Sequence, residues 1–211
     1  MPSVEEKSLP AIVPLKIRGT TFWAYLDTGS GRNLISKAAA NKLKLNPIRH
    51  ETHYIVTVNG TKKQSMPIYD VTINSINSKA SEKIEITGSK LTDFTTIKRP
   101  TLTELKEKFQ QVQGKVFYRT ASEEYTIHVI LGDATYCKIR TEHAHKGQPD
   151  DPIVEGTTFG WIVHGGKEYA DSKCMYMRET DEYERLYSLD VLEGRGRQSA
   201  RRLQGISREH I

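Results

Sequence analysis

The chain has 211 residues, of which 36% are hydrophobic, so it is long enough for one domain with extensions and apolar enough to build a core. Its 31 Lys and Arg exceed its 26 Asp and Glu, but residues 194–211 hold five Arg against Glu209 and carry +4 of the net charge of +5. The pI of about 9.1 therefore belongs mainly to the tail and does not mark the folded part as a nucleic-acid-binding protein.

The cellular compartment is indicated by the absence of a secretory signal and of a membrane-spanning run. Cys137 and Cys174 match no metal-ligand spacing, and two thiols in such a chain favour a reducing environment. Residues 1–10 read as an N-terminal extension without the apolar stretch of a secretory signal. No run approaches the roughly 18–20 apolar residues of a membrane span. We expect a cytoplasmic protein with no membrane segment.

The first elements are predicted to be a hairpin and a helix. Residues 11–18 and 21–26 are short apolar runs that are typical of paired β-strands. Residues 34–45 then change to helical spacing, with Ser36 as the N-cap. Pro47 ends this predicted helix.

A second hairpin is predicted in the middle of the chain. Residues 52–58 and 66–73 are rich in β-formers, and the polar segment between them contains Asn59-Gly60, a strong hairpin-turn dipeptide. Residues 83–88 form a further predicted strand.

The later part of the chain mixes one helix with several strands. Residues 102–112 have helical spacing, with Thr101 or Thr103 near the start. Residues 125–131 form an apolar strand, and residues 153–163 form a strand pair interrupted by glycines. The sequence thus predicts a mainly β protein with two helices in the connections.

The most informative segment is the end of the second apolar run, where Asp27 is followed by Thr28, Gly29 and Ser30. Gly29 permits close approach of another chain, and the two hydroxyls can bind a carboxylate or the backbone. The pattern can hold one carboxyl group rigidly in a polar niche. The plainer interpretation is a simple turn, because all four residue types favour turns.

The context of Asp27 supports the first interpretation. "YLDTGSGRNLIS" resembles the active-site segment of retropepsin-type aspartic peptidases, and "HVILGDATY" (128–136) resembles their second shared element. "ILGDATYCKIRTE" followed by "PIVEGTTFGWIVHGG" resembles the aspartic peptidase domain of BEL/Pao retrotransposon polyproteins, and "LYSLDVLEG" resembles the connector behind it.

The resemblance implies a retropepsin-like closed β-barrel of the acid-protease type, with one or two connecting helices. It places the peptidase domain at residues 11–166, with an insertion at 88–122. The fall in apolar residues after Gly166 predicts a linker at 167–193 and a basic, disordered tail at 194–211. The resemblance also implies that Ile130, Leu131 and Gly132 pack beneath the active-site loop.

The implied reaction is hydrolysis of a polyprotein by an aspartic endopeptidase. The chain contains one Asp-Thr-Gly, and the resemblance makes Asp133 structural, so the second carboxylate comes from another copy. In such a homodimer one Asp27 activates a water, its protonated counterpart polarises the scissile carbonyl, and neither metal nor cofactor is required. Thr28 hydrogen-bonds across the axis, and Gly29 presents backbone groups.

A substrate-covering flap is expected at Val58, Asn59, Gly60 and Thr61, which occupy the position in the order of segments where such a hairpin belongs. The alternative for these four residues is an ordinary exposed hairpin.

Three further interpretations stay open. The chain can be a catalytically inactive binding or structural module of the same fold. The tail can bind RNA or be a frameshifted end, and its lack of aromatic residues favours the latter. His143 and His145 can face one side of a strand but lack the further ligands that zinc needs, and Cys137 is expected to be a small buried residue.

Overall fold

The computed structural model describes residues 8–57, 60–118 and 124–166. The linker predicted at 167–193 and the tail predicted at 194–211 lie outside the described residues. No helix in the described ranges combines the length and the apolar character needed to cross a bilayer.

The strands of the described residues form two sheets. Their bounds are β1 (Ile12–Ile17), β2 (Thr20–Asp27), β3 (Leu34–Ile35), β4 (Arg49–Thr57), β5 (Gly60–Asn74), β6 (Ser81–Gly88), β7 (Thr95–Lys98), β8 (Glu124–Gly132), β9 (Arg140–Lys146), β10 (Ile153–Thr157) and β11 (Gly160–His164). Short helices connect them: α1 (Lys37–Lys42), α2 (Leu102–Lys108), the 3₁₀ turn η1 (Gln110–Val112) and α3 (Asp133–Ile139).

Six strands close into a barrel. They follow the order β1-β2-β8-β3-β6-β5, and the last strand returns to the first because Lys16 pairs with Asn74 and Ile17 with Ile73. Alternating side chains along these strands point into one apolar core. The prediction of a mainly β fold with a closed barrel is confirmed.

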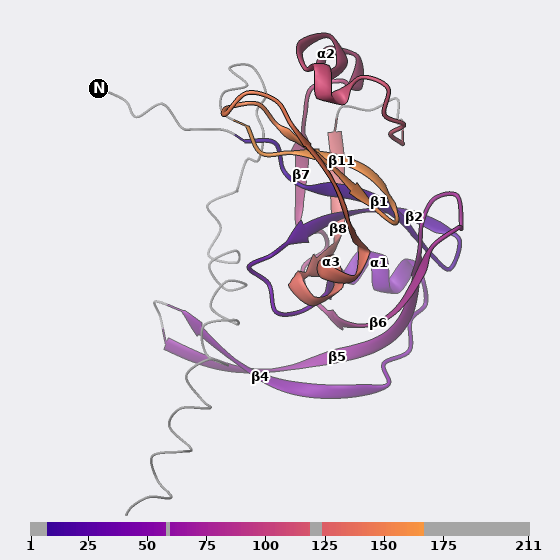
Figure 1. Cartoon of the computed structure of the whole chain (residues 1–211). Coiled ribbons are helices and arrows are strands. Elements are labelled where there is room, and N and C mark those ends of the chain that lie inside the picture. The colour runs from indigo at the N-terminus through magenta and orange to yellow at the C-terminus, as the bar shows by residue number, and fades with distance from the viewer. Residues whose placement is uncertain (1–7, 58–59, 119–123, 167–211) are drawn as a thin grey trace, which may run out of the picture.

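The two predicted hairpins are present. In β1–β2 the register Ile17↔Thr20 leaves Arg18 and Gly19 as a two-residue turn, with φ of 49° and 77°. The second hairpin is longer than predicted. β5 pairs with β6 along Ile68–Asn74, whereas residues 60–67 pair with β4 alone, so the hairpin leaves the barrel as a two-stranded ribbon (Figure 1).

The helix predicted at 34–45 is shorter in the structure. Ser36 is its N-cap, as predicted, and its side chain accepts a hydrogen bond from the Ala39 N–H. Leu34 and Ile35 were wrongly included in this helix. They form β3, because their backbone is needed to join β6 to β8 and complete the barrel.

The helix predicted at 102–112 begins as expected. The Thr101 side chain accepts from the Glu104 N–H, and Glu104 accepts from the Thr101 backbone, which makes a capping box. The helix ends at Lys108 because Phe109 is extended, and the turn η1 follows. Leu105 and Val112 pack on Val154 and Val163 of the second sheet.

The second sheet has the order β11-β10-β9. The strand pair predicted at 153–163 is confirmed as β10 and β11. Strands β7 and β9 and helix α3 have no counterpart among the predicted elements. Thr158 donates a backbone hydrogen bond to the Ile139 carbonyl (2.7 Å), and this contact attaches the sheet to the end of α3.

Candidate active site

Asp27 is the last residue of β2 and lies where the buried alternation of that strand ends. It is partly exposed, and Thr28 and Gly29 after it are exposed. One carboxylate oxygen, Oδ1, accepts a hydrogen bond from the Gly29 N–H at 2.9 Å, and the Asp27 carbonyl accepts from Ser30 N–H at 3.2 Å. The chain therefore turns sharply at the carboxylate and leaves one side of the loop open.

Ser30 fixes the inner side of this loop. It is buried, its Oγ donates to the Arg32 carbonyl at 2.8 Å, and its own carbonyl accepts from the Asp133 N–H at 2.9 Å. The last bond joins the loop to the first residue of α3. The loop is thus held by its neighbours in space as well as by its own turn.

Gly132 supports the loop from below. It lies opposite Asp27 in the parallel pairing of β2 with β8. A Cβ atom on Gly132 would lie 2.6 Å from the Ser30 carbonyl oxygen and 2.7 Å from that of Arg32, which leaves room for glycine alone. Ile130 and Leu131 before it are buried.

Asn33 contributes in a way that the sequence analysis missed. Its side-chain oxygen accepts the Gly132 N–H at 3.0 Å, its amide donates to the Glu85 carbonyl at 3.0 Å, and its backbone carbonyl accepts from Thr87 N–H. One residue thereby ties the loop to β6 and β8. Its position directly after a turn was the available signal, but Asn in a turn has many ordinary explanations.

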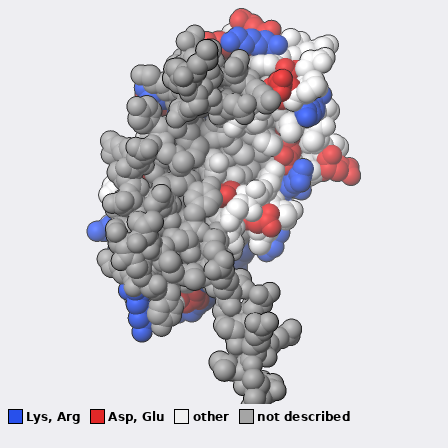
Figure 2. Space-filling view, turned by 90° about the vertical axis from the view of Figure 1, so that its left-hand side faces the viewer, with Lys and Arg blue, Asp and Glu red and all other residues white. Residues whose placement is uncertain are grey.

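Charged residues link the loop to the hairpin ribbon. Arg32 pairs with Glu51 of β4 at 3.1 Å, and Arg49 binds both Glu51 at 2.7 Å and Glu85 at 2.6 Å. Hydrogen bonds from Arg49, then from Arg32, lower the pKa of Glu51, and the Arg49 bond lowers the pKa of Glu85. Figure 2 shows acidic and basic side chains intermixed where described residues form the surface.

The predicted flap is described in part. Val58 and Asn59 lie outside the described residues. Gly60 and Thr61 are the first residues of β5, paired with Thr57 and Val56, so Gly60 belongs to the strand instead of the middle of the turn.

The other residues considered from the sequence, His143, His145 and Cys137, lie outside the Asp27 loop. The His143 and His145 rings lie 6.4 Å and 5.6 Å from the Trp161 ring. Within the described ranges, no three or more His, Cys, Asp or Glu side chains are grouped to hold a metal ion. Cys137 is exposed, which corrects the expectation of a buried thiol: α3 turns Tyr136 and Ile139 inward instead.

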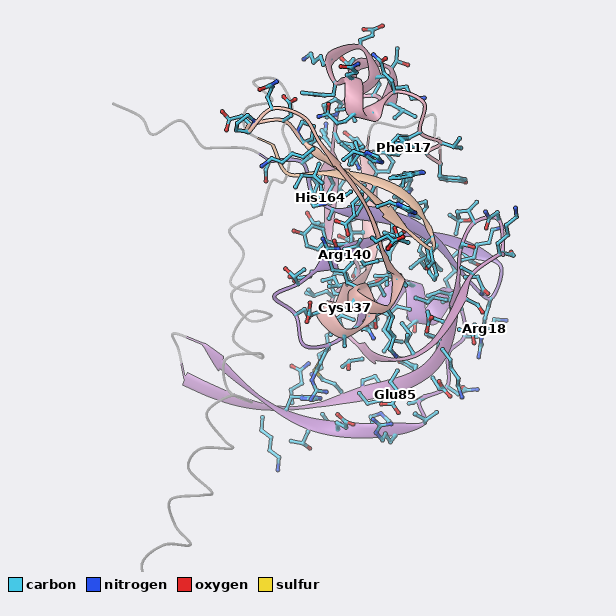
Figure 3. All side chains as sticks on the ribbon, viewed as in Figure 1. Arg18, Glu85, Phe117, Cys137, Arg140 and His164 are labelled. Carbon is cyan, nitrogen blue, oxygen red and sulfur yellow. The ribbon has the colours of Figure 1, made fainter. Side chains whose placement is uncertain are left out.

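A second carboxylate, which the sequence analysis did not single out, is Glu155. Its side chain is 2% exposed and accepts bonds from the Tyr136 hydroxyl at 2.7 Å, Arg140 Nε at 2.7 Å and His164 Nε2 at 3.0 Å. Burial, followed by the bond to Glu155, raises the pKa of Tyr136, which therefore remains a donor. In Figure 3, Arg140 and His164 lie above Cys137 where α3 meets the second sheet. This carboxylate is enclosed and has a structural position.

Comparison with solved structures gives low similarity. The simian foamy virus (mac) protease is 22% identical, with a TM-score of 0.28, over 37% of this chain and 77% of that one. The retroviral protease-like domain of Ddi1 from Leishmania major is 9% identical, with a TM-score of 0.36, over 74% and 92%. The prototype foamy virus protease-reverse transcriptase is 19% identical, with a TM-score of 0.29, over 47% and 14%.

These scores are too low to carry an argument, and no curated protein matches the sequence significantly. The family model described as "Aspartyl protease" matches residues 13–80, which include the whole Asp27 loop and the hairpin ribbon. The matched segment holds the Asp27 turn, and Gly132 supports that turn from outside the segment, so the match and the geometry point to the same loop.

Proposed function

We propose that the chain is an aspartic endopeptidase of retrotransposon type, which cuts a polyprotein as a homodimer with one Asp27 from each copy. The observation that carries the proposal is the Asp27 loop: its carboxylate is partly exposed at a strand end, in a turn held from below by Gly132.

A second copy is required because the sequence contains a single Asp-Thr-Gly. The buried carboxylate of Glu155 is 2% exposed and already bound by three side chains, so it cannot face a substrate. A two-fold axis beside Asp27 would supply an identical carboxylate from the partner. Thr28 and Gly29, which follow Asp27 and are exposed, would then meet their counterparts.

The chemistry follows from two carboxylates placed a few ångströms apart. They share one proton, because two negative charges at this distance repel strongly. The charged Asp27 takes a proton from a water, and the resulting hydroxide adds to the scissile carbonyl while the protonated Asp27 of the other copy donates to the carbonyl oxygen. Collapse of the tetrahedral intermediate breaks the C–N bond, and a carboxyl proton passes to the leaving amine.

The hairpin ribbon is proposed to cover the substrate as a flap. Residues 60–67 are paired with β4 alone, and Arg32–Glu51 attaches the base of the ribbon to the catalytic loop. Such a ribbon can move relative to the barrel and exclude water when it closes.

The test is Asp27→Asn, with cleavage measured on a peptide library. The variant removes the acid–base group, so we expect cleavage to fall by about 10²- to 10⁴-fold with an unchanged thermal unfolding midpoint. Asp70→Asn is the matched control: Asp70 binds Lys83 on another strand, and its variant should cleave normally. Undiminished cleavage by Asp27→Asn would overturn the proposal.

Asp133→Asn separates the homodimer from an intramolecular pair. Asp133 is exposed and contacts the loop through its backbone N–H, which the substitution preserves. We expect this variant to retain cleavage. A loss as large as that of Asp27→Asn would instead place the second carboxylate within the same chain.

A further inference from the structure

A hollow lined by aromatic rings, the aromatic hollow, lies against the outside of the barrel. It has about 450 Å³ of empty space, open to solvent, between strands β1, β2 and β8, the start of α2 and strand β11. Five of its lining residues are aromatic, and none of the five is buried: Trp23, Phe117, Tyr118, Tyr125 and Trp161. Aromatic surface that is left accessible in one place marks a contact site for another segment or molecule.

The aromatic hollow is separate from the Asp27 loop. Trp23 precedes Asp27 by four residues along β2, which span about 13 Å at about 3.3 Å each. Figure 3 shows Phe117 beside α2, at the end of the molecule that lies away from the ribbon of β4 and β5. An occupant of the aromatic hollow can therefore bind without covering the Asp27 carboxylate.

The charge at the aromatic hollow is positive. Arg99 is the charged residue among the described residues that line it, and its Nη2 donates to the Val163 carbonyl at 3.1 Å. Lys115 adds a second cation, since its Nζ lies 4.5 Å from the centre of the Trp161 ring. Val116, next to Lys115, is 83% exposed. The aromatic hollow thus fits a partner that combines apolar side chains with carboxylates.

The chain itself contains a segment of this composition. Residues 181–193 include six large apolar side chains: Tyr183, Leu186, Tyr187, Leu189, Val191 and Leu192. They also hold five Asp or Glu and one Arg, a net charge of 1 − 5 = −4. Residues 194–211 carry +4 instead, so the charge of the aromatic hollow favours the first segment over the tail.

The segment is attached to the chain close to the aromatic hollow. Trp161, Ile162 and Val163 line the hollow, and Gly166 is the last described residue. Sixteen residues separate Gly166 from Tyr183. A coil of this length spans about 20–24 Å on average, and such tethers give effective concentrations of about millimolar. A segment that binds only weakly can therefore still occupy the hollow of its own chain.

We propose that residues 181–193 dock in the aromatic hollow of their own chain. Leu186 and Tyr187 bind against the aromatic rings, and the acidic side chains of the segment face Arg99 and Lys115. Docking fixes the direction in which the chain leaves the barrel. The proposal does not depend on the activity of Asp27, so either can fail without the other.

The two tryptophans of the chain provide the readout, because Trp23 and Trp161 both line the aromatic hollow. The test is acrylamide quenching of their fluorescence in the unmodified chain and in the double variant Leu186→Asp/Tyr187→Asp. We expect the quenching constant of the double variant to be about twofold higher, because charged side chains replace the apolar ones that hold the segment in place. Leu203→Asp, the same kind of change in the tail, is the control and should quench like the unmodified chain.

Two further measurements identify the occupant. A synthetic peptide of residues 181–193, added to the double variant, should restore the protection seen in the unmodified chain, whereas the same peptide carrying both substitutions should not. Protection in the unmodified chain should survive dilution by about a hundredfold, because the segment is tethered.

Three results would overturn the proposal. Equal quenching of the unmodified chain and the double variant would show that the segment does not cover the tryptophans. A peptide that fails to protect the double variant would show that the aromatic hollow does not bind this sequence. Protection that disappears on dilution would assign the hollow to a second copy of the chain.

Discussion

Two carboxylates in this molecule, those of Asp27 and Glu155, have opposite surroundings. Asp27 lies partly exposed at the end of β2, and its carboxylate accepts a hydrogen bond from a backbone N–H of its own turn. Glu155 lies in β10 with 2% exposure and is bound by side chains from α3, β9 and β11. A carboxylate that is saturated by donors stabilises a junction, whereas one that is held by its backbone and left open can react.

The largest expected effect on stability comes from breaking the enclosed carboxylate. Glu155→Ala leaves the buried Tyr136 hydroxyl without an acceptor and should cost about 3–5 kcal/mol of unfolding free energy, measured by urea denaturation. Glu155→Gln keeps an acceptor and should cost less. Glu107→Ala, an exposed site on α2, is the control and should stay within about 0.5 kcal/mol. A Glu155→Ala variant as stable as this control would refute the structural role.

The next effect concerns the support beneath Asp27. Gly132→Ala places a Cβ against two backbone oxygens that cannot rotate away, so the loop must shift. We expect a loss of about 2–4 kcal/mol and of most cleavage activity. Gly114→Ala is the comparison, since a Cβ there meets no atom within 4 Å and the cost arises from its φ of 70° alone, about 1 kcal/mol. Equal losses in both variants would show that Gly132 has no special role beneath the Asp27 loop.

A smaller loss of stability, without loss of cleavage, is expected when α2 is weakened. Thr101→Ala removes the capping box and should cost about 1 kcal/mol of unfolding free energy. Because α2 packs on the second sheet and contributes no residue to the Asp27 loop, the rate of cleavage should not change. A fall in cleavage at a temperature where the variant is folded would show that this segment acts on the site.

The smallest effect is on the pH dependence of stability. The pKa values of Glu51 and Glu85 are lowered in the folded chain, chiefly by Arg49. Their contribution is therefore present above the unfolded pKa near 4.5 and is lost as pH falls below it. Arg49→Ala should flatten the acid decline of the urea midpoint slightly, since the pairs are exposed. An unchanged decline would assign acid sensitivity to other groups.

The sequence predicted the elements that have local signals. The Ser36 and Thr101 caps, the first hairpin and the apolar strand before Gly132 all depend on residues that are close together in the chain. The closed barrel followed from a resemblance, because no local pattern reveals that β5 returns to β1.

The parts that the sequence did not predict depend on contacts between distant segments. Leu34 and Ile35 have helical spacing but become a strand, since their backbone completes the barrel. Asn33 and Glu155 acquire their roles from partners far away in sequence, Gly132 and Tyr136. Cys137 is exposed because the neighbouring residues of α3 take the inward face.

The central claim is that two chains share one active centre, and titration of Asp27→Asn into the unmodified chain tests it most directly. At fixed total concentration, after subunits have exchanged, a centre that needs both Asp27 residues predicts activity falling as the square of the unmodified fraction, to about a quarter at an equal mixture. A linear fall to about one half would show that each chain works alone, and would contradict the account.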